Sequence, residues 1–151
     1  MTQHSVIAVD TSVAVPLLTG SHEAHATVLA WAAGRSLALS GHALVETYSV
    51  LTRLPGDARV AAQDAVALID SNFEVRLVLT ERQAADAHRE FARLGIDGGA
   101  VYDALVALAA LNTGATLATR DARAHNTYEA VSYTHLRAHE TDSYLVCRLL
   151  L

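Results

Sequence analysis

Two patterns of apolar and polar positions alternate along the chain, and each predicts one kind of element. Short apolar or alternating runs predict strands over residues 6–9, 36–40, 73–79 and 115–119. Longer stretches with apolar residues at helical spacing predict helices over 12–20, 22–34, 42–54, 57–71, 80–95 and 100–114. Strands that alternate with helices predict an α/β domain with a parallel sheet covered by helices on both faces.

The composition fits one globular domain. The chain has 151 residues, of which 52% are hydrophobic and 18% charged, and this length can bury a core without disulfides or structural metal. The single cysteine, Cys147, excludes an internal disulfide and a cysteine-rich metal site. No apolar run approaches the roughly 20 residues that span a bilayer, and the N-terminus has no basic segment typical of a signal peptide. We therefore expect a cytoplasmic protein that does not enter a membrane.

The charged residues exclude several kinds of site. The formal net charge is −5, and every basic residue is an arginine because the chain has no lysine. A P-loop and a Schiff-base site both need a lysine, so these classes are excluded. An acidic balance also argues against nonspecific binding to duplex DNA, although local arginine contacts with a nucleic-acid backbone remain compatible with it.

The last residues differ in composition and periodicity from the rest of the chain. Residues 132–151 bring Tyr, His and Thr without helical or strand periodicity, where the remainder is rich in Ala, Val and Leu. An α/β domain should finish with a strand at a sheet edge, and the stretch "YLVCRLLL" is one candidate for it. The segment also resembles translated sequencing-adapter sequence. We predict a domain over residues 1–131 followed by an atypical, non-native tail, from which no function is inferred.

Two aspartates follow predicted strands. Asp10 comes after "VIAV", and Asp121 comes after "TLATR". In an open parallel sheet, ligands bind beyond the carboxyl ends of the strands. An aspartate after a strand is also a common N-cap of the next helix. Because the same arrangement occurs after two different strands, a functional interpretation gains weight over two separate caps.

Two more acids occur within apolar helix sequence. Asp103 lies in "GGAVYDALVALAALN", where small residues occupy the neighbouring helical positions, and Glu46 lies in "GHALVETYSVL". A poorly solvated carboxylate either raises its pKa or meets a cation. For Glu46 the alternative is a partly exposed helix acid, for example paired with Arg53 or Arg120.

Together the four acids have a simple chemical explanation. Carboxylate oxygens without cysteine or a histidine cluster suit the hard cations Mg²⁺ and Mn²⁺, which also neutralise the repulsion between the acids. Hydroxyl groups beside them, on Thr11, Ser12 and Thr119, can hydrogen-bond a ligand carboxylate or a water. Such a site activates water for attack on a phosphodiester.

Other polar residues nearby have weaker claims. Arg120 and Arg123 are candidates for contacts with a substrate phosphate, because the planar guanidinium matches phosphate geometry. His22 and His25 are three residues apart, but without a third ligand we interpret them as part of a solvated helix face rather than a metal site.

At this point the sequence resembles a known family. The stretches "VIAVDTS", "ALVETYSVLTRL", "GGAVYDALVALAA" and "TLATRDARAHNTYE" resemble, in this order and spacing, the PIN-domain ribonucleases of the VapC toxin type. The resemblance covers about residues 5–131 and is specific as an ensemble of four motifs.

The resemblance implies a fold, an activity and partners. It implies a three-layer α/β/α fold with a mostly parallel sheet of about four to five strands. It also implies a metal-dependent endoribonuclease, usually a homodimer, that is inhibited by a cognate antitoxin protein. Carried over by position, the Mg²⁺ or Mn²⁺ ligands and catalytic acids are Asp10, Glu46, Asp103 and Asp121, with Thr119 as the supporting hydroxyl.

Two alternatives remain beside a toxin ribonuclease. One is a catalytically silent PIN-like binding module, against which the presence of all four acids argues. The other is a different metal-dependent phosphohydrolase, such as a haloacid-dehalogenase-like phosphatase. That class needs an aspartate two residues after the first and a downstream lysine, whereas this chain has Ser12 and no lysine.

Overall fold

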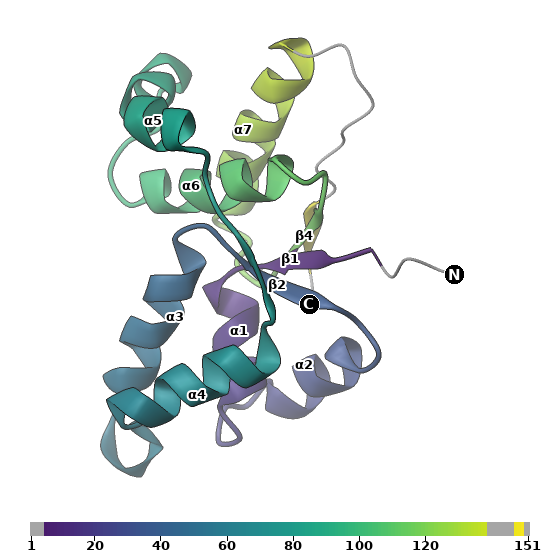
Figure 1. Cartoon of the computed structure of the whole chain (residues 1–151), viewed down its shortest axis with the longest axis vertical. Coiled ribbons are helices and arrows are strands. Elements are labelled where there is room, and N and C mark those ends of the chain that lie inside the picture. Colours follow the sequence, from purple (N-terminus) through teal and green to yellow (C-terminus); the bar gives the residue numbers. More distant parts are fainter. Residues whose placement is uncertain (1–4, 139–146, 150–151) are drawn as a thin grey trace.

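Three layers make up the molecule, with a parallel sheet between two groups of helices (Figure 1). The structure is a computed structural model that describes residues 5–138 and 147–149, with side chains up to residue 132. The predicted α/β architecture with helices on both faces of the sheet is confirmed. Within the described residues, no helix is both long and apolar enough to cross a membrane.

The sheet has the order β3-β2-β1-β4-β5, and every neighbouring pair is parallel. Its central strand β1 pairs Ala8 with Ala38 of β2 on one side and with Leu117 of β4 on the other. The strands are β1 (Ile7–Val9), β2 (Leu37–Ser40), β3 (Val75–Leu77), β4 (Thr116–Thr119) and β5 (Cys147–Leu149). Because the strands are parallel, the residues that follow β1 and β4 lie at the same edge of the sheet.

Helices α1 to α4 cover one face, and α5 to α7 cover the other (Figure 1). Their bounds are α1 (Thr11–Leu18), α2 (His25–Ala32), α3 (Ala43–Thr52), α4 (Ala62–Asn72), α5 (Glu81–Leu94), α6 (Ala100–Leu111) and α7 (His125–Ala138). Helix α1 packs against α2 and α3, and α6 packs against α5 and α7. The two layers therefore each form a continuous cover over the sheet.

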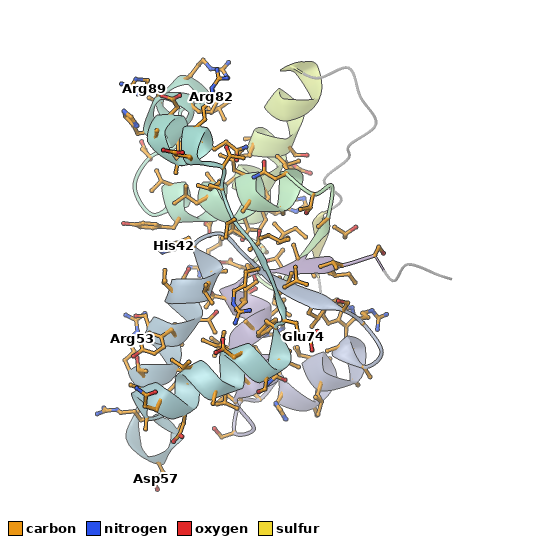
Figure 2. The ribbon with its side chains drawn as sticks, in the orientation of Figure 1. His42, Arg53, Asp57, Glu74, Arg82 and Arg89 are labelled. Atoms are coloured by element: carbon orange, nitrogen blue, oxygen red, sulfur yellow. The ribbon has the colours of Figure 1, made fainter. Side chains whose placement is uncertain are left out.

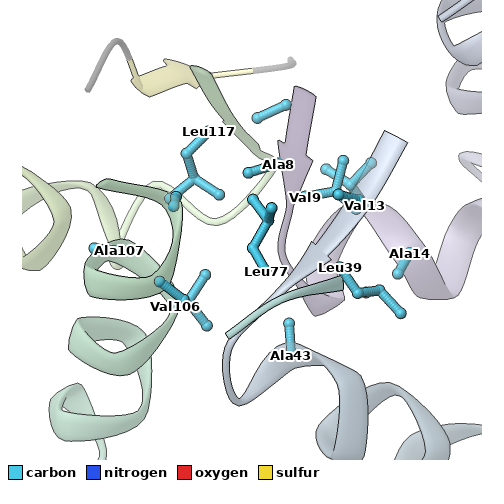
Figure 3. Close-up of a cluster of buried hydrophobic side chains, with 14 of the residues drawn as sticks. Ala8, Val9, Val13, Ala14, Leu39, Ala43, Leu77, Val106, Ala107 and Leu117 are labelled. Carbon is cyan, nitrogen blue, oxygen red and sulfur yellow. The ribbon is translucent and has the colours of Figure 1, made fainter. Parts of the chain in front are cut away.

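The core lies on both faces of the central strands. Figure 3 shows Val9, Leu39 and Leu117 of the sheet beside Val13 of α1 and Val106 of α6. All five side chains are buried. The many alanines of α6 allow the helix to approach the strands closely, since small side chains bring the backbones together. This packing holds the ends of β1 and β4, and the residues that follow them, in fixed positions.

Most predicted elements are found, with two differences. Helix α4 begins at Ala62, later than predicted: Gly56–Ala58 form a short 3-10 helix, and residues 59–61 are extended, where the Val60 N–H donates to the Leu51 carbonyl of α3. Helix α7 was not predicted. Its buried residues Tyr128 and Val131, with Ala124 just before the helix, do have helical spacing, but polar residues surround them and Val131 is the one large aliphatic side chain among the three.

Helix α7 continues across the domain boundary predicted at residue 131, and Cys147–Leu149 pairs with β4 as a strand. The chain thus has a strand in the "YLVCRLLL" stretch, one of the two interpretations given for it. Residues 139–146 and 150–151 of the predicted tail lie outside the described residues. The non-native origin of residues 132–151 stays a prediction.

Candidate metal centre

Asp10 is a buried carboxylate held by hydroxyl groups. It follows β1 directly, and 5% of its surface is exposed. The Ser12 hydroxyl donates to Oδ1 at 2.6 Å, the Tyr128 hydroxyl donates to Oδ2 at 2.8 Å, and the Thr119 hydroxyl also donates to Oδ2. The Asp10 side chain makes no capping hydrogen bond to α1, so the cap alternative does not apply to it. Its orientation is instead set by residues from three elements.

The same hydroxyls connect the end of β1 to the end of β4. The Ser12 Oγ accepts the backbone N–H of Arg120 at 2.7 Å, and the Thr119 Oγ1 accepts that of Asp121 at 3.0 Å. Asp121 itself accepts the Arg123 N–H at 2.9 Å, within the loop that precedes the start of α7 at His125. Asp10 and Asp121 are therefore fixed in one hydrogen-bonded network that crosses from β1 to β4.

Glu46 and Asp103 reach the same edge from opposite layers. Each lies in the first turn of its helix, α3 and α6 respectively. The two helix starts meet where His42 and Tyr102 stack with ring centroids 4.5 Å apart. Figure 2 shows His42 at this junction, with Arg53 at the opposite end of α3.

Gly41 permits this close approach. Its φ of +55° is a conformation that residues with a Cβ rarely adopt. A Cβ added there would lie 2.6 Å from the Leu105 carbonyl oxygen of α6. Beside it, the buried Ser40 hydroxyl donates to the Val106 carbonyl at 2.7 Å. These contacts hold the start of α3 against the α6 backbone, and they set the distance between the two helices that carry Glu46 and Asp103.

Asp103 differs electrostatically from an ordinary aspartate. Its pKa is raised to about 6, chiefly by burial and then by the negative charges of Asp121, Asp10 and Glu46, while Arg123 acts in the opposite direction. All three other acids thus act on one carboxyl group. The structure thus places the four acids close enough to interact electrostatically.

The donor set suits a hard divalent cation. Carboxylate and hydroxyl oxygens surround the edge, and mutual repulsion among the acids is relieved by a cation. The Thr11 hydroxyl is buried and has no hydrogen-bond partner within the described residues, which leaves it available at this edge. No three His, Cys, Asp or Glu side chains of the described residues are gathered closely enough to form a complete metal cluster. The acids therefore converge on a shared region without already being in ligand contact.

A cavity of about 420 Å³ opens beside the acids. Glu46 and Asp121 line it, whereas Asp10 and Asp103 do not. Its wall combines acids, arginines and apolar side chains: Thr11, Ser12, Val15, Pro16, His22, Glu46, Val50, Arg120, Asp121 and Arg123. Both arginines predicted to contact a phosphate thus lie on the cavity, and Arg123 is highly exposed and 3.4 Å from the Asp121 carboxylate.

Two residues of this region were not found from the sequence. Tyr128 contacts Asp10 although it lies 118 positions away, and we assigned it no role. No local pattern marked it, because α7 itself was not predicted. His22, which we interpreted as part of a solvated face, is half-buried and lines the cavity.

Comparison with known proteins identifies the family of the chain. Residues 7–130 match the PIN domain family. Ribonuclease VapC27 of Mycobacterium tuberculosis strain H37Rv is 58% identical over 125 residues, which cover 83% of this chain and 91% of that protein. Ribonuclease VapC40 of Mycobacterium tuberculosis strain CDC 1551 is 42% identical over 128 residues, covering 82% of this chain and 92% of the relative. The chain therefore belongs to the PIN domain family. Within that class, it is a ribonuclease of the VapC type.

Solved structures show the same fold at low sequence identity. VapC20 of Mycobacterium tuberculosis, a toxin that cleaves the sarcin-ricin loop, has a TM-score of 0.62 at 22% identity and covers 80% of this chain and 93% of its own. VapBC2 of Rickettsia felis, bound to promoter DNA, has a TM-score of 0.61 at 15% identity and covers 97% of this chain and 99% of its own. These likenesses support the architecture.

Proposed function

We propose that the chain is a metal-dependent endoribonuclease and the toxin of a toxin–antitoxin pair, with Asp10, Glu46, Asp103 and Asp121 as its catalytic acids. The observation that carries this proposal is the convergence of four acids from four separate elements on one edge of the sheet, where three of them raise the pKa of the fourth. Identity to two VapC ribonucleases over more than four-fifths of the chain supports the substrate class.

Mg²⁺ or Mn²⁺ is the proposed cofactor, held by the four acids with Thr11 nearby. When bound, the cation lowers the pKa of water and stabilises charge on a phosphodiester under attack. The chain's own residues prepare for this. Ser12, Thr119 and Tyr128 donate to Asp10 and fix the orientation of its carboxylate.

Arg120 and Arg123 are the proposed phosphate contacts. Both line the cavity, and the main-chain N–H groups of both are already fixed by Ser12 and Asp121. Their backbone is thus held, and the Arg123 Nε–H also donates to the Asp121 carboxylate at 3.4 Å. An arginine pair next to a carboxylate edge offsets the repulsion that the acids exert on an incoming RNA backbone.

The proposed partners are RNA, an antitoxin protein and a second copy of the chain. Structural relatives include VapBC2 and FitAB, the latter bound to a DNA fragment called IR36 with a TM-score of 0.60. Exposed apolar side chains on α3 and α4 offer protein contacts: Val45, Tyr48 and Val66. Light scattering coupled to size-exclusion chromatography tests the homodimer, which a monomer at micromolar concentration would contradict.

A cytoplasmic location is proposed with this function.

Cleavage of RNA by the purified chain tests the activity. We expect cleavage with Mg²⁺ or Mn²⁺ and none with EDTA. Asp10→Asn and Asp103→Asn should each lower the rate by more than about 10²-fold, because loss of a direct ligand exceeds the loss of an outer partner. Circular dichroism should show that both variants remain folded. Full activity in both variants would refute the assignment of the acids.

A further inference from the structure

The wall of the cavity beside the acids changes in chemistry along α1 and α3. The first turns of these helices contribute Ser12 and Glu46, and the loop after β4 contributes Asp121 and the two arginines. About one turn further along the helices the lining is apolar, with Val15, Pro16 and Val50, and His22 follows the end of α1. At about 420 Å³ the cavity falls within the size range of small-ligand sites. A nucleotide has the same division, since its phosphate is charged and its base has flat apolar faces.

His22 is held in a defined orientation by the turn that contains it. Its backbone N–H donates to the Thr19 carbonyl at 3.0 Å, and its carbonyl accepts the His25 N–H at 2.9 Å. The ring nitrogen Nδ1 accepts the Ala24 N–H at 3.1 Å. Because Nδ1 is an acceptor, the neutral ring carries its hydrogen on Nε2. His22 therefore has a free donor position, and no hydrogen bond in the described residues uses it.

His25 shows the contrast within the same turn. Its Nδ1 lies 2.8 Å from the Pro16 carbonyl oxygen, which can only accept, so this histidine donates and ties α2 to α1. The His25 ring thus serves the fold. His22 instead lines the cavity, with its backbone and one ring nitrogen anchored.

We propose that His22 is a specificity-determining residue that contacts one unstacked base of the RNA, next to the phosphate that is cleaved. This inference rests on the proposed function. The phosphate end of that nucleotide lies toward Glu46, Asp121 and the arginines, and the base packs among Val15, Val50 and the His22 ring. Single-stranded bases are commonly stacked on aromatic side chains, histidine included, and read by hydrogen bonds to their edges. The Nε2–H selects bases that present an acceptor.

Three variants separate this role from a structural one. His22→Asn removes the ring but keeps a side-chain oxygen able to accept the Ala24 N–H. His22→Phe keeps a stacking surface and removes the donor. His88→Ala is the matched control, because His88 is exposed on α5, in the other helical layer (the neighbouring Arg89 is labelled in Figure 2).

The measurements are KM, kcat and the bases at the cleaved ends of a randomised single-stranded RNA pool, with Mn²⁺ affinity and Tm alongside. For His22→Asn we expect KM to rise about tenfold, within the range for loss of one base–aromatic contact, and the base preference at the cleaved end to relax. His22→Phe should keep KM within a few fold while its base preference changes. Mn²⁺ affinity should match the wild type in all three variants, and His88→Ala should match it in every respect.

Unchanged KM and unchanged cleaved ends in His22→Asn would overturn the inference while leaving the ribonuclease activity established. Loss of binding to an antitoxin peptide, with RNA cleavage unaltered, would overturn it too, because the cavity would then serve a protein. If the wild type does not cleave RNA and Asp10→Asn behaves identically, the proposed function fails and this inference with it.

Discussion

Asp10 and Asp103 are aspartates at the same edge of one sheet, yet their surroundings differ. Asp10 is almost fully buried and accepts hydrogen bonds from three hydroxyl groups. Asp103 is half-buried, and both burial and the neighbouring acids raise its pKa to about 6. One carboxylate is positioned by the fold, and the other is destabilised in its charged form. This edge therefore combines a carboxylate fixed by hydrogen bonds with one whose charged form a bound cation would stabilise.

The largest expected effect comes from removing the Asp10 side chain. Asp10→Ala removes the carboxylate that accepts hydrogen bonds from Thr119 and Tyr128, and each hydrogen bond to a charged group contributes about 1.5–3 kcal/mol. We expect the free energy of unfolding to fall by about 3 kcal/mol in urea denaturation without metal. Asp103→Ala should show no such loss. Equal destabilisation by both variants would remove the distinction between the two acids.

The next largest effect concerns Gly41, where α3 begins against the backbone of α6, the helix that carries Asp103. Gly41→Ala adds a Cβ against the Leu105 carbonyl at a positive φ, so we expect a loss of about 2–3 kcal/mol in unfolding free energy. Gly34→Ala is the control, because Gly34 has a φ of +73° and nothing within 4 Å of the added atom. The difference between the two variants isolates the contact with α6. Equal losses would show that the approach carries no energetic cost.

The hydrogen bond from Tyr128 to Asp10 can be tested by itself. Tyr128→Phe removes one donor to Asp10, and partners that orient a metal ligand are worth about 10–100-fold in affinity. We expect Mn²⁺ binding, measured by calorimetry, to weaken about tenfold and stability to fall by about 1 kcal/mol. Tyr102→Phe is the matched control on exposed Tyr102, next to Asp103, and should leave Mn²⁺ affinity unchanged. Equal weakening in both would contradict a specific role for Tyr128.

The smallest effect is a pH dependence at Asp103. Its folded pKa, about 6, lies above the ordinary value of 3.8, so the folded protein binds more protons than the unfolded chain between these values. Stability of the metal-free wild type should therefore fall as pH rises through this window. Asp103→Asn should lose this contribution, and its Tm relative to wild type should increase from about pH 4 to about pH 7. A constant Tm difference across the window would contradict the raised pKa. Mn²⁺ binding should strengthen over the same range, because the ligand must lose its proton.

Much of the fold could be predicted because local patterns carry it. Apolar runs identified β1 to β4, and the capping box at Thr80 and Gln83 with Gly95 correctly marked both ends of α5. The start of α4 and the whole of α7 could not be found this way. Val60 is held extended by a hydrogen bond to Leu51 of another helix, and α7 owes its buried face to contacts with α6.

The sequence by itself determined the four acids of the proposed site, because strand ends and apolar helices mark Asp10, Asp121, Glu46 and Asp103 as unusual positions. Only the tertiary structure decided the burial, the hydrogen bonds and the neighbouring charges of each acid. Tyr128 approaches Asp10 across 118 positions of sequence, and Gly41 brings α3 against α6, so neither contact leaves a local pattern. Burial and charge depend on neighbours in space. For this reason two aspartates of identical chemistry became an anchored acid and a destabilised one.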